Sequence, residues 1–195
     1  ILYRENDCVF RFNIDNTYFS PRLSNERKEV ALEIKKHSKK NDKILIMFSG
    51  VSPYSIVIAK NCKNCEIYSI ELNRAATKYA FLNKDLNGVR NMEVIQGDVK
   101  KVIPKLIMNG MKFDFIVMPR PQLKDSFLKQ AFDVAKHGTR IYYYDFCNEE
   151  DLQRIIKMVE DEAAKEGKRI KILNVKKAGE IGPYKLRVRV DFVVI

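Results

Sequence analysis

From Lys43 onward, short apolar runs alternate with longer stretches whose apolar residues recur at helical spacing. The runs are bounded by turn residues and predict five strands: KILIMF (43–48), EIYSIEL (66–72), MEVIQGD (92–98), FDFIVM (113–118) and RIYYYDF (140–146). The intervening stretches predict helices over 53–60, 74–87, 100–109 and 124–137, the last stopped by Gly138. Strands and helices that alternate in this way are typical of βαβ units and a largely parallel sheet.

Before Lys43, the pattern predicts one strand and one helix. Residues 8–14 (CVFRFNI) alternate between apolar and polar positions as a strand does. Ser24 or Asn25 can cap a helix over ERKEVALEIKKHS (26–38), whose apolar residues have helical spacing.

After the fifth strand, Asn148 can cap a long helix over 149–167 that ends at Gly167. Two final strands, 170–175 and 186–195, are close enough in the sequence to pair antiparallel. We therefore predict an α/β fold of the Rossmann type. Its sheet is doubly wound, mostly parallel and seven-stranded, with an antiparallel C-terminal strand pair.

The composition is ordinary for a globular protein, with 46% hydrophobic and 31% charged residues among 195. No apolar run approaches the roughly 18 residues of a membrane span, and no signal core follows Ile1. We expect a cytoplasmic protein, and the missing initiator methionine suggests a fragment. The four cysteines are expected to be free thiols. Cys62 and Cys65 form a C-x-x-C motif without a second pair, so no metal is expected.

The chain is strongly basic, with 36 Lys and Arg against 25 Asp and Glu, a formal charge of +11 and a pI of about 9.4. Such a surface neutralises phosphates and releases counterions, which favours a polyanionic partner and nucleic acid above all. The alternative is a solvated lysine-rich surface, and composition does not decide between the two. Lysines of this kind are Lys35, Lys36, Lys39, Lys40 and Lys43.

The first of the five strands leads through a turn of small residues, FSGVSP (48–53), into a helix. At such a turn the backbone can approach a ligand without interference from side chains. The turn has a single glycine, Gly50, so it can equally be a structural connection.

Acidic residues follow the next two strands. Glu71 lies 21 residues beyond Gly50, where a carboxylate accepts hydrogen bonds from both hydroxyls of a ribose. Asp98 closes the third strand and can accept a hydrogen bond from an adenine amino group. Each carboxylate can instead cap the helix that follows it. Because the two follow adjacent strands, together they favour a nucleoside pocket.

The fourth strand ends in VMPRP (117–121), a rigid turn that would line the reacting end of this pocket. Its alternative explanation is plain turn chemistry. Tyr142, Tyr143 and Tyr144 lie on the fifth strand, where packing accounts for most of them.

Three stretches go beyond a generic fold: YFSPRL (18–23) followed by Glu26 and Arg27, MFSGVSPYS (47–55) and IYYY (141–144). They resemble the archaeal and eukaryotic tRNA guanine-N1 methyltransferases, which modify the purine beside the anticodon, and their wybutosine-pathway relatives. The likeness covers almost the whole chain, from residues 4–6 to residues 190–192.

The resemblance implies that the chain binds S-adenosyl-L-methionine. Ser20 and Arg27 would approach the methionine moiety, with the Arg27 guanidinium at its carboxylate, while Glu71 takes the ribose and Asp98 the adenine side. The expected cofactor-binding residues are Ser20, Arg27, Phe48, Ser49, Gly50, Ser52, Glu71, Leu72, Asn73, Asp98, Val99, Met118 and Pro119.

The resemblance also implies a transferase whose partner is tRNA, and we expect a monomer. Arg22 is the expected catalytic residue, since it matches an arginine that positions or activates the guanine by stabilising negative charge on O6. The expected tRNA-binding residues are Arg22, Arg120, Lys124, Lys185 and Arg187, with Arg11 and Arg189 as further phosphate contacts.

The family carries N-terminal domains that help to grip tRNA. We therefore expect residues 1–23, a strand and the FSPRL segment, to be the end of a preceding domain. Residues 24–195 would form the S-adenosylmethionine-binding catalytic domain.

Three positions depart from the family pattern. The family usually has Asp at Ile46, Gly at Ser52, and Asn-Leu-Pro at residues 117–119. The resemblance implies that this asparagine holds the target nitrogen or its proton. Valine cannot accept a hydrogen bond, so another base or a bound water would have to serve. Val117 favours the wybutosine branch, which transfers an aminocarboxypropyl group, whereas Arg22 favours the methyltransferase branch.

The principal hypothesis is therefore S-adenosylmethionine-dependent methylation of guanine N1 next to the anticodon of tRNA. One alternative is aminocarboxypropyl transfer to tRNA in wybutosine synthesis. A second is a module that binds S-adenosylmethionine and RNA but has lost catalysis, as the three departures would permit. The positive charge disfavours a third, the methylation of a small molecule or a protein.

Overall fold

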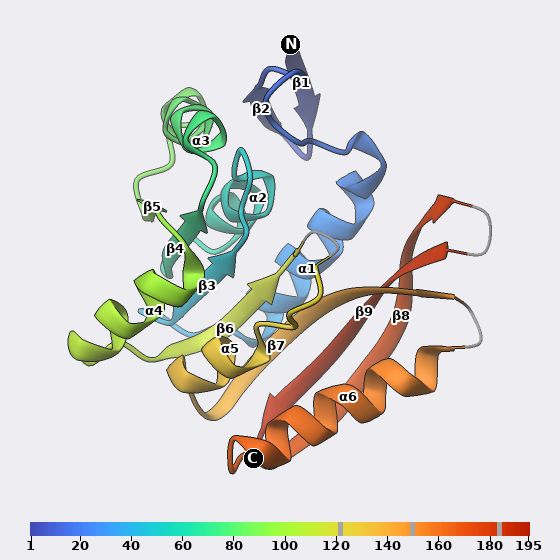
Figure 1. Ribbon diagram of the computed structural model, residues 1–195. Coiled ribbons are helices and arrows are strands. Elements are labelled where there is room, and N and C mark those ends of the chain that lie inside the picture. The colour runs from blue at the N-terminus through green and yellow to red at the C-terminus, as the bar shows by residue number, and fades with distance from the viewer. Residues whose placement is uncertain (121–122, 149–150, 183–184) are drawn as a thin grey trace. The chain divides into compact units, whose positions relative to one another are not determined.

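The computed structural model describes residues 1–195 except 121–122, 149–150 and 183–184, and except the side chain of residue 181. The chain folds into two compact units, residues 1–102 and residues 103–195 (Figure 1). In both units strands and helices follow each other largely as the hydrophobic pattern predicts.

A small antiparallel hairpin opens the first unit. Its strands are β1 (Leu2–Glu5) and β2 (Cys8–Arg11). The turn residues Asn6 and Asp7 have φ angles of 49° and 57°, as two-residue hairpin turns require. The strand expected over 8–14 is therefore too long. It ends early because Asn13 begins a turn, in which its carbonyl accepts the N–H of Thr17 at 3.0 Å.

The first long helix begins without a side-chain cap. A 3-10 turn, η1 (Pro21–Leu23), runs directly into α1 (Ser24–His37), and Leu23 occupies the cap position. The predicted caps at Ser24 or Asn25 are thus wrong. Ser24 already lies in the first helical turn, where its Oγ accepts a hydrogen bond from Asn6 at 3.3 Å.

Three parallel strands follow in the first unit, paired in the order β5-β4-β3. They are β3 (Lys43–Met47), β4 (Glu66–Glu71) and β5 (Met92–Gln96), and the helices after β3 and β4 are α2 (Pro53–Asn61) and α3 (Arg74–Leu86). Helix α4 (Val99–Met108) follows β5 and contains the boundary between the two units. Ile44, Leu45 and Ile46 are completely buried, so both faces of β3 are covered, as in the middle of a parallel sheet. The carboxyl ends of the three strands meet at one edge, where the candidate residues follow them.

The second unit combines a parallel and an antiparallel pairing. Strand β6 pairs parallel with β7, and β9 pairs antiparallel with both β7 and β8. The elements are β6 (Phe113–Met118), α5 (Leu128–Val134), β7 (Ala135–Asn148), α6 (Leu152–Lys165), β8 (Ile170–Gly182) and β9 (Lys185–Val194).

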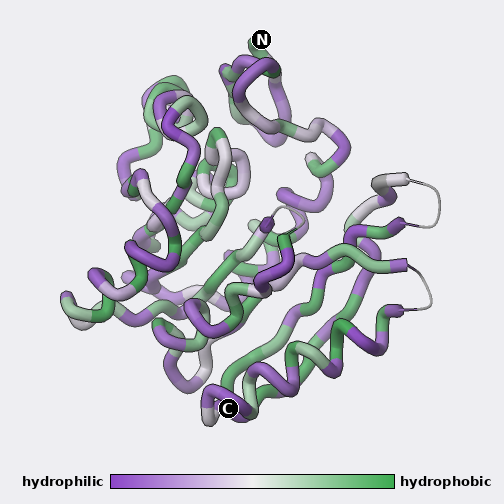
Figure 2. Tube along the Cα trace, viewed as in Figure 1, coloured by the Kyte–Doolittle hydropathy of each residue, from purple (hydrophilic) through white to green (hydrophobic). Residues whose placement is uncertain are grey.

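Helix α6 is amphipathic, and hydrophobic and hydrophilic residues alternate along it in Figure 2. Its buried residues Ile155, Val159 and Ala163 recur every fourth position and form a single apolar stripe.

The seven strands of the two units are ordered β5-β4-β3-β6-β7-β9-β8. This order and the antiparallel β9 confirm the predicted Rossmann-type, mostly parallel seven-stranded sheet with an antiparallel C-terminal pair. In the part of the chain that the structure describes, no helix is long and apolar enough to cross a membrane.

Two predictions for the region between β6 and β7 are wrong. The helix expected over 124–137 spans only Leu128–Val134, and Gly138 does not end it. Instead β7 starts at Ala135, and Gly138, with φ of 87°, lies in an irregularity of that strand. The adjacent Thr139 fixes this irregularity, because its hydroxyl donates to the Phe113 carbonyl at 2.6 Å.

The start of α6 differs from the prediction as well. Asn148 is the last residue of β7, and Asp151 occupies the cap position of α6. Residues 149–150, where the helix was expected to begin, lie outside the described residues, as does Pro121 of the VMPRP turn.

Candidate cofactor-binding site

The turn between β3 and α2 holds three residues in the left-handed region. Phe48, Gly50 and Ser52 have φ angles of 58°, 58° and 65°. This conformation strains a residue that carries a side chain by roughly 1–2 kcal/mol. Strained backbone of this kind collects at ligand clamps and active sites. The turn therefore has the conformation of a binding loop although it contains only one glycine.

Buried hydroxyls hold Ser52 in place. The Ser52 Oγ lies 3.0 Å from the Oγ of Ser69, which lies 2.8 Å from the Oγ of Ser55, and all three residues are completely buried. Ser69 on β4 is also the register partner of Ile46 on β3. The chain thus has a serine network beside Ile46, where the resembled family has glycine and aspartate.

Glu71 ends β4 and is bound to the Gly50 turn. Its Oε2 accepts the backbone N–H of Gly50 at 2.7 Å, and its Oε1 accepts the N–H of Asn73 at 2.7 Å. A carboxylate offers about four acceptor positions, so these two bonds leave capacity for the hydroxyls of a ribose. Leu72, the next residue, is 63% exposed and offers an apolar surface beside that carboxylate.

Asp98 follows β5 at the same edge of the sheet. The backbone N–H of Gly97 donates to the carbonyl of Glu71 at 2.8 Å, which ties the ends of β4 and β5 together. The Asp98 Oδ1 accepts the N–H of Lys100 at 2.8 Å, so the residue caps α4, and Val99 behind it is buried. Capping and ligand binding are compatible here, because only one carboxylate oxygen caps the helix.

The segment 16–20 passes across this turn. The Asn73 amide donates to the carbonyl of Asn16 at 3.0 Å, while the Asn73 Oδ1 caps α3. The carbonyl of Tyr18 lies 3.6 Å from the position that a Cβ on Gly50 would take. Residues far apart in the sequence therefore frame one small region within the first unit.

Arg27 is buried behind this segment. Its Nε and Nη2 bind the two carboxylate oxygens of Glu5 at 2.5 and 2.6 Å, and Nη2 also donates to the Ser20 carbonyl at 2.9 Å. The guanidinium lies 4.9 Å from the centre of the Phe19 ring. Sequence reasoning missed Glu5, because no local pattern links residues 22 positions apart.

Arg22 has a different environment from Arg27. It lies on the short 3-10 turn η1, and its side chain is exposed. Among the described residues it has no ion-pair partner, so its guanidinium is available to a ligand.

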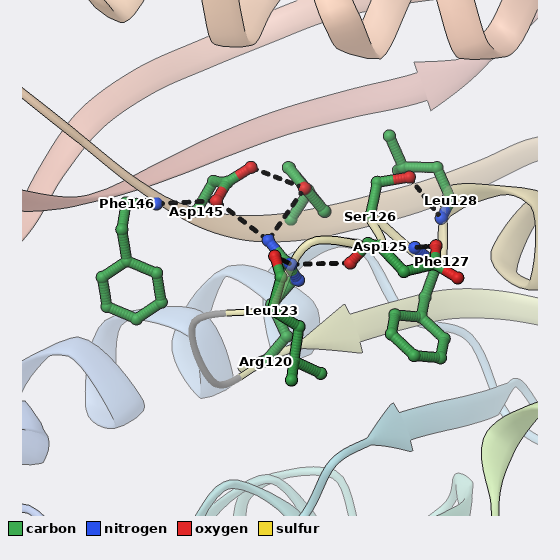
Figure 3. A network of polar contacts seen from close by, with 9 residues as sticks. Arg120, Leu123, Asp125, Ser126, Phe127, Leu128, Asp145 and Phe146 are labelled. Atoms are coloured by element: carbon green, nitrogen blue, oxygen red, sulfur yellow. Dashed lines mark hydrogen bonds and ion pairs between the residues drawn. The ribbon is translucent and has the colours of Figure 1, made fainter.

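Arg120 belongs to a polar network in the second unit (Figure 3). The residue is 2% exposed, and its Nη1 donates to Asp145 at 2.9 Å. Its Nη2 donates to the carbonyls of Leu123 and Asp125 at 2.5 and 2.6 Å. Tyr143 donates to the other oxygen of Asp145 at 2.7 Å, and burial raises the pKa of Tyr143 above its ordinary value. Arg120 thus points inward and binds the loop that follows β6.

The other expected residues of the second unit differ in exposure. Val117 and Met118 are completely buried on β6, and Pro119 is half-buried. Lys124 and Lys185 are exposed. Arg187 is half-buried beside the Phe146 ring, and Arg189 is buried and paired with Asp191 at 2.7 Å.

The four cysteines are thiols, not disulfides, and all of them are buried. Burial raises the pKa of Cys62 from 9.0 to about 12, so this thiol stays protonated near neutral pH. No group of three or more His, Cys, Asp or Glu side chains in the described part of the chain could hold a metal ion.

A parallel sheet in which the second strand ends in a carboxylate bound to a glycine turn defines a Rossmann-type domain with the layout of a nucleoside site. The resemblance seen in the sequence agrees with this class. The chain belongs to the TRM5/TYW2 methyltransferase domain family, whose model matches residues 1–173.

Three of the similar proteins come from archaea. The tRNA (guanine(37)-N(1))/4-demethylwyosine(37)-methyltransferase Taw22 of Nanoarchaeum equitans is 34% identical and is matched over 99% of this chain and 78% of its own length. The crystal structure of Pyrococcus abyssi Trm5b has a TM-score of 0.85 at 29% identity, covering 99% of this chain but 55% of that protein. The Methanocaldococcus jannaschii TYW2 structure with AdoMet has a TM-score of 0.84 at 27% identity, covering 100% and 86%. The chain thus spans only about half of Trm5b.

Proposed function

We propose that this chain is the S-adenosylmethionine-binding module of an enzyme that alkylates a purine of tRNA, with methyl transfer to guanine N1 beside the anticodon as its reaction. Membership of the TRM5/TYW2 family supports the reaction class. The single observation that supports the cofactor site is the Glu71 carboxylate, which is bound to the Gly50 turn and keeps acceptor positions for a ribose.

The residues at this edge fit an adenosine with an amino-acid tail. Glu71 would accept the ribose hydroxyls, and Asp98 and Leu72 would take the adenine. Ser20 and Arg27 would receive the methionine end. When bound, the cofactor supplies a sulfonium whose attached carbon is the electrophile.

The protein would act mainly by holding the purine in line with that carbon, because proximity and orientation remove much of the barrier of a bimolecular transfer. The target base would have to leave the stack to reach it. The exposed Arg22 guanidinium would stabilise negative charge on the guanine O6 as N1 loses its proton. Lys124, Lys185 and Arg187 would bind tRNA phosphates.

Aminocarboxypropyl transfer to tRNA is the second candidate. It is favoured by Val117, which is buried on β6 and cannot hold the N1 proton as the family asparagine does. Arg22 favours methyl transfer instead, because it matches the arginine of the methyltransferase branch.

Titration calorimetry with S-adenosylmethionine, followed by mass spectrometry of tRNA incubated with protein and cofactor, tests the proposal. We expect binding, and a tRNA mass gain that matches a methyl group. The gain of an aminocarboxypropyl group would establish the second candidate instead. Binding without transfer to any tRNA would leave a binding module, and absence of binding would overturn the proposal.

Two variants connect the activity to the site. Glu71→Ala should weaken cofactor binding about tenfold or more, since a charge-assisted hydrogen bond contributes roughly 1.5–3 kcal/mol. Arg22→Ala should leave cofactor binding unchanged and slow transfer. Glu93→Ala, which removes an exposed carboxylate from β5, is the matched control and should change neither.

A further inference from the structure

The Glu5–Arg27 ion pair is buried in the first unit. The two side chains are 2% and 1% exposed, and both carboxylate oxygens are bound by the guanidinium. Removing two charges from water is expensive, and a buried pair of this kind is often no more stabilising than apolar residues of the same volume. Stability alone is therefore a weak reason for its presence.

The pair fixes the plane of the guanidinium. Glu5 holds the edge formed by Nε and Nη2, the Ser20 carbonyl takes a second proton of Nη2, and the Phe19 ring covers one face at 4.9 Å. The nitrogen that remains is Nη1, which forms no hydrogen bond with the described residues.

Arg27 lies beside the Gly50 turn. Its guanidinium is 6.0 Å from the ring of Tyr54, the second residue of α2, which begins directly after that turn. The same segment that gives Arg27 the Ser20 carbonyl also brings the Tyr18 carbonyl next to Gly50. A guanidinium nitrogen placed here would suit a carboxylate at the end of a ligand held by the turn.

We propose that Glu5 is a positioning residue for ligand recognition, which holds Arg27 so that Nη1 binds the carboxylate of S-adenosylmethionine. This inference rests on the proposed function. Because Glu5 neutralises Arg27, the net charge of the pair is zero, and recognition depends on the direction of the N–H rather than on excess positive charge. The β1–β2 hairpin, which carries Glu5, is thereby part of the cofactor site.

S-adenosylmethionine and its decarboxylated analogue provide the test, since they differ only in the carboxylate. Calorimetry on the whole chain gives the ratio of their dissociation constants. We expect the wild type to prefer S-adenosylmethionine about tenfold or more, the value of one charge-assisted hydrogen bond. Glu5→Gln and Arg27→Ala should each reduce this ratio to near one, and the double variant should reduce it no further than Arg27→Ala does.

Two further variants separate the effect of the position of the Glu5 carboxylate from the effects of its charge and of overall protein stability. Glu5→Asp keeps the charge but withdraws the carboxylate by one methylene, so it should lower the ratio too. It also replaces Glu5→Gln if that variant does not fold. Asp191→Asn breaks the buried Arg189–Asp191 pair of the second unit, and it should lower stability while leaving the ratio unchanged.

The outcomes separate the possible roles. If Glu5→Gln or Glu5→Asp weakens both ligands in parallel, Glu5 serves only the fold and the inference is overturned. A higher ratio in Glu5→Gln overturns it as well, because Glu5 would then merely oppose the charge of Arg27. Equal affinities of the wild type for both ligands overturn the inference but leave cofactor binding intact. Failure of the wild type to bind either ligand overturns the proposed function together with the inference.

Discussion

Gly50 and Gly88 are two glycines with almost the same backbone and different surroundings. Their φ angles are 58° and 60°, and a Cβ would lie 3.6 Å from the Tyr18 carbonyl at Gly50 but in open space at Gly88. Neither Cβ would clash, so an alanine at either position suffers mainly from the left-handed backbone. Only Gly50 lies in the proposed cofactor turn.

Gly50→Ala and Gly88→Ala should therefore each lower the free energy of unfolding by about 1 kcal/mol, as alanine does where φ is positive. Only Gly50→Ala should also weaken S-adenosylmethionine binding. Urea unfolding and calorimetric titration of the two variants check this expectation. Equal cofactor affinity in both would remove the Gly50 turn from the proposed pocket.

The raised pKa of the Cys62 thiol predicts how the free energy of unfolding depends on pH. Burial raises its pKa from 9.0 to about 12 in the folded chain. Below pH 9 the thiol is protonated in both states, so its full contribution to stability is present. As pH rises from 9 towards 12, the unfolded chain loses the proton while the folded chain keeps it, and stability falls by up to about 1.4 kcal/mol per pH unit.

Urea unfolding at pH 8, 9 and 10 should therefore show a smaller loss of stability in Cys62→Ala than in the wild type. The comparison uses the slope with pH, so a constant effect of the lost side-chain volume does not enter. Parallel slopes would mean that the thiol titrates normally in the folded chain.

At the scale of elements, the loop between β6 and α5 depends on a residue of β7. Arg120 binds the carbonyls of Leu123 and Asp125 in this loop, and Asp145 on β7 holds Arg120 (Figure 3). A phosphate-binding role for Arg120 stays a prediction, but its inward direction favours positioning of the loop. The helix expected over 124–137 begins only at Leu128, because the backbone carbonyls of Leu123 and Asp125 accept hydrogen bonds from Arg120 instead of from helical N–H groups.

Asp145→Asn should destabilise the protein by about 2 kcal/mol. Breaking a buried ion pair typically removes 3–5 kcal/mol, and the 20% exposure of the Asp145 side chain reduces this loss. Hydrogen exchange should accelerate at the amides of Phe127 and Leu128. Asp133→Asn, which removes a partner of the exposed Lys129, is the control and should change stability by less than about 0.5 kcal/mol. Equal losses of stability in the two variants would contradict the role of Asp145 in holding Arg120 and the loop.

At the scale of the whole molecule, the charge of +11 predicts how tRNA binding responds to salt. Log Kd should change linearly with log salt concentration, since each neutralised phosphate releases counterions. Lys185→Ala should lower the slope by about 1, as the loss of one phosphate contact does. Filter-binding measurements of Kd between 50 and 200 mM salt give this slope. Lys105→Ala on α4 is an exposed lysine outside the expected set, and an equal loss of slope there would mean that the charge acts without a defined surface.

Much of the fold could be predicted from the sequence, because hydrophobic periodicity is a local property. Strand β6 has the predicted bounds, and β3, β4 and β5 differ from the prediction by one or two residues at their ends. The predicted element bounds are wrong where a contact with a residue distant in the sequence determines the backbone conformation. Gly138 looked like a helix stop, yet the bond between Thr139 and Phe113 places it in β7.

The sequence by itself determined the order of strands and helices, and it placed Glu71 and Asp98 after neighbouring strands, because the carboxyl ends of parallel strands share an edge. Only the tertiary structure decided which charges pair. Glu5 with Arg27 and Arg120 with Asp145 are 22 and 25 residues apart, and nothing in their local sequence selects the partner. Hydrophobic periodicity determines the secondary structure of a single element, whereas an ion pair depends on which elements pack against each other.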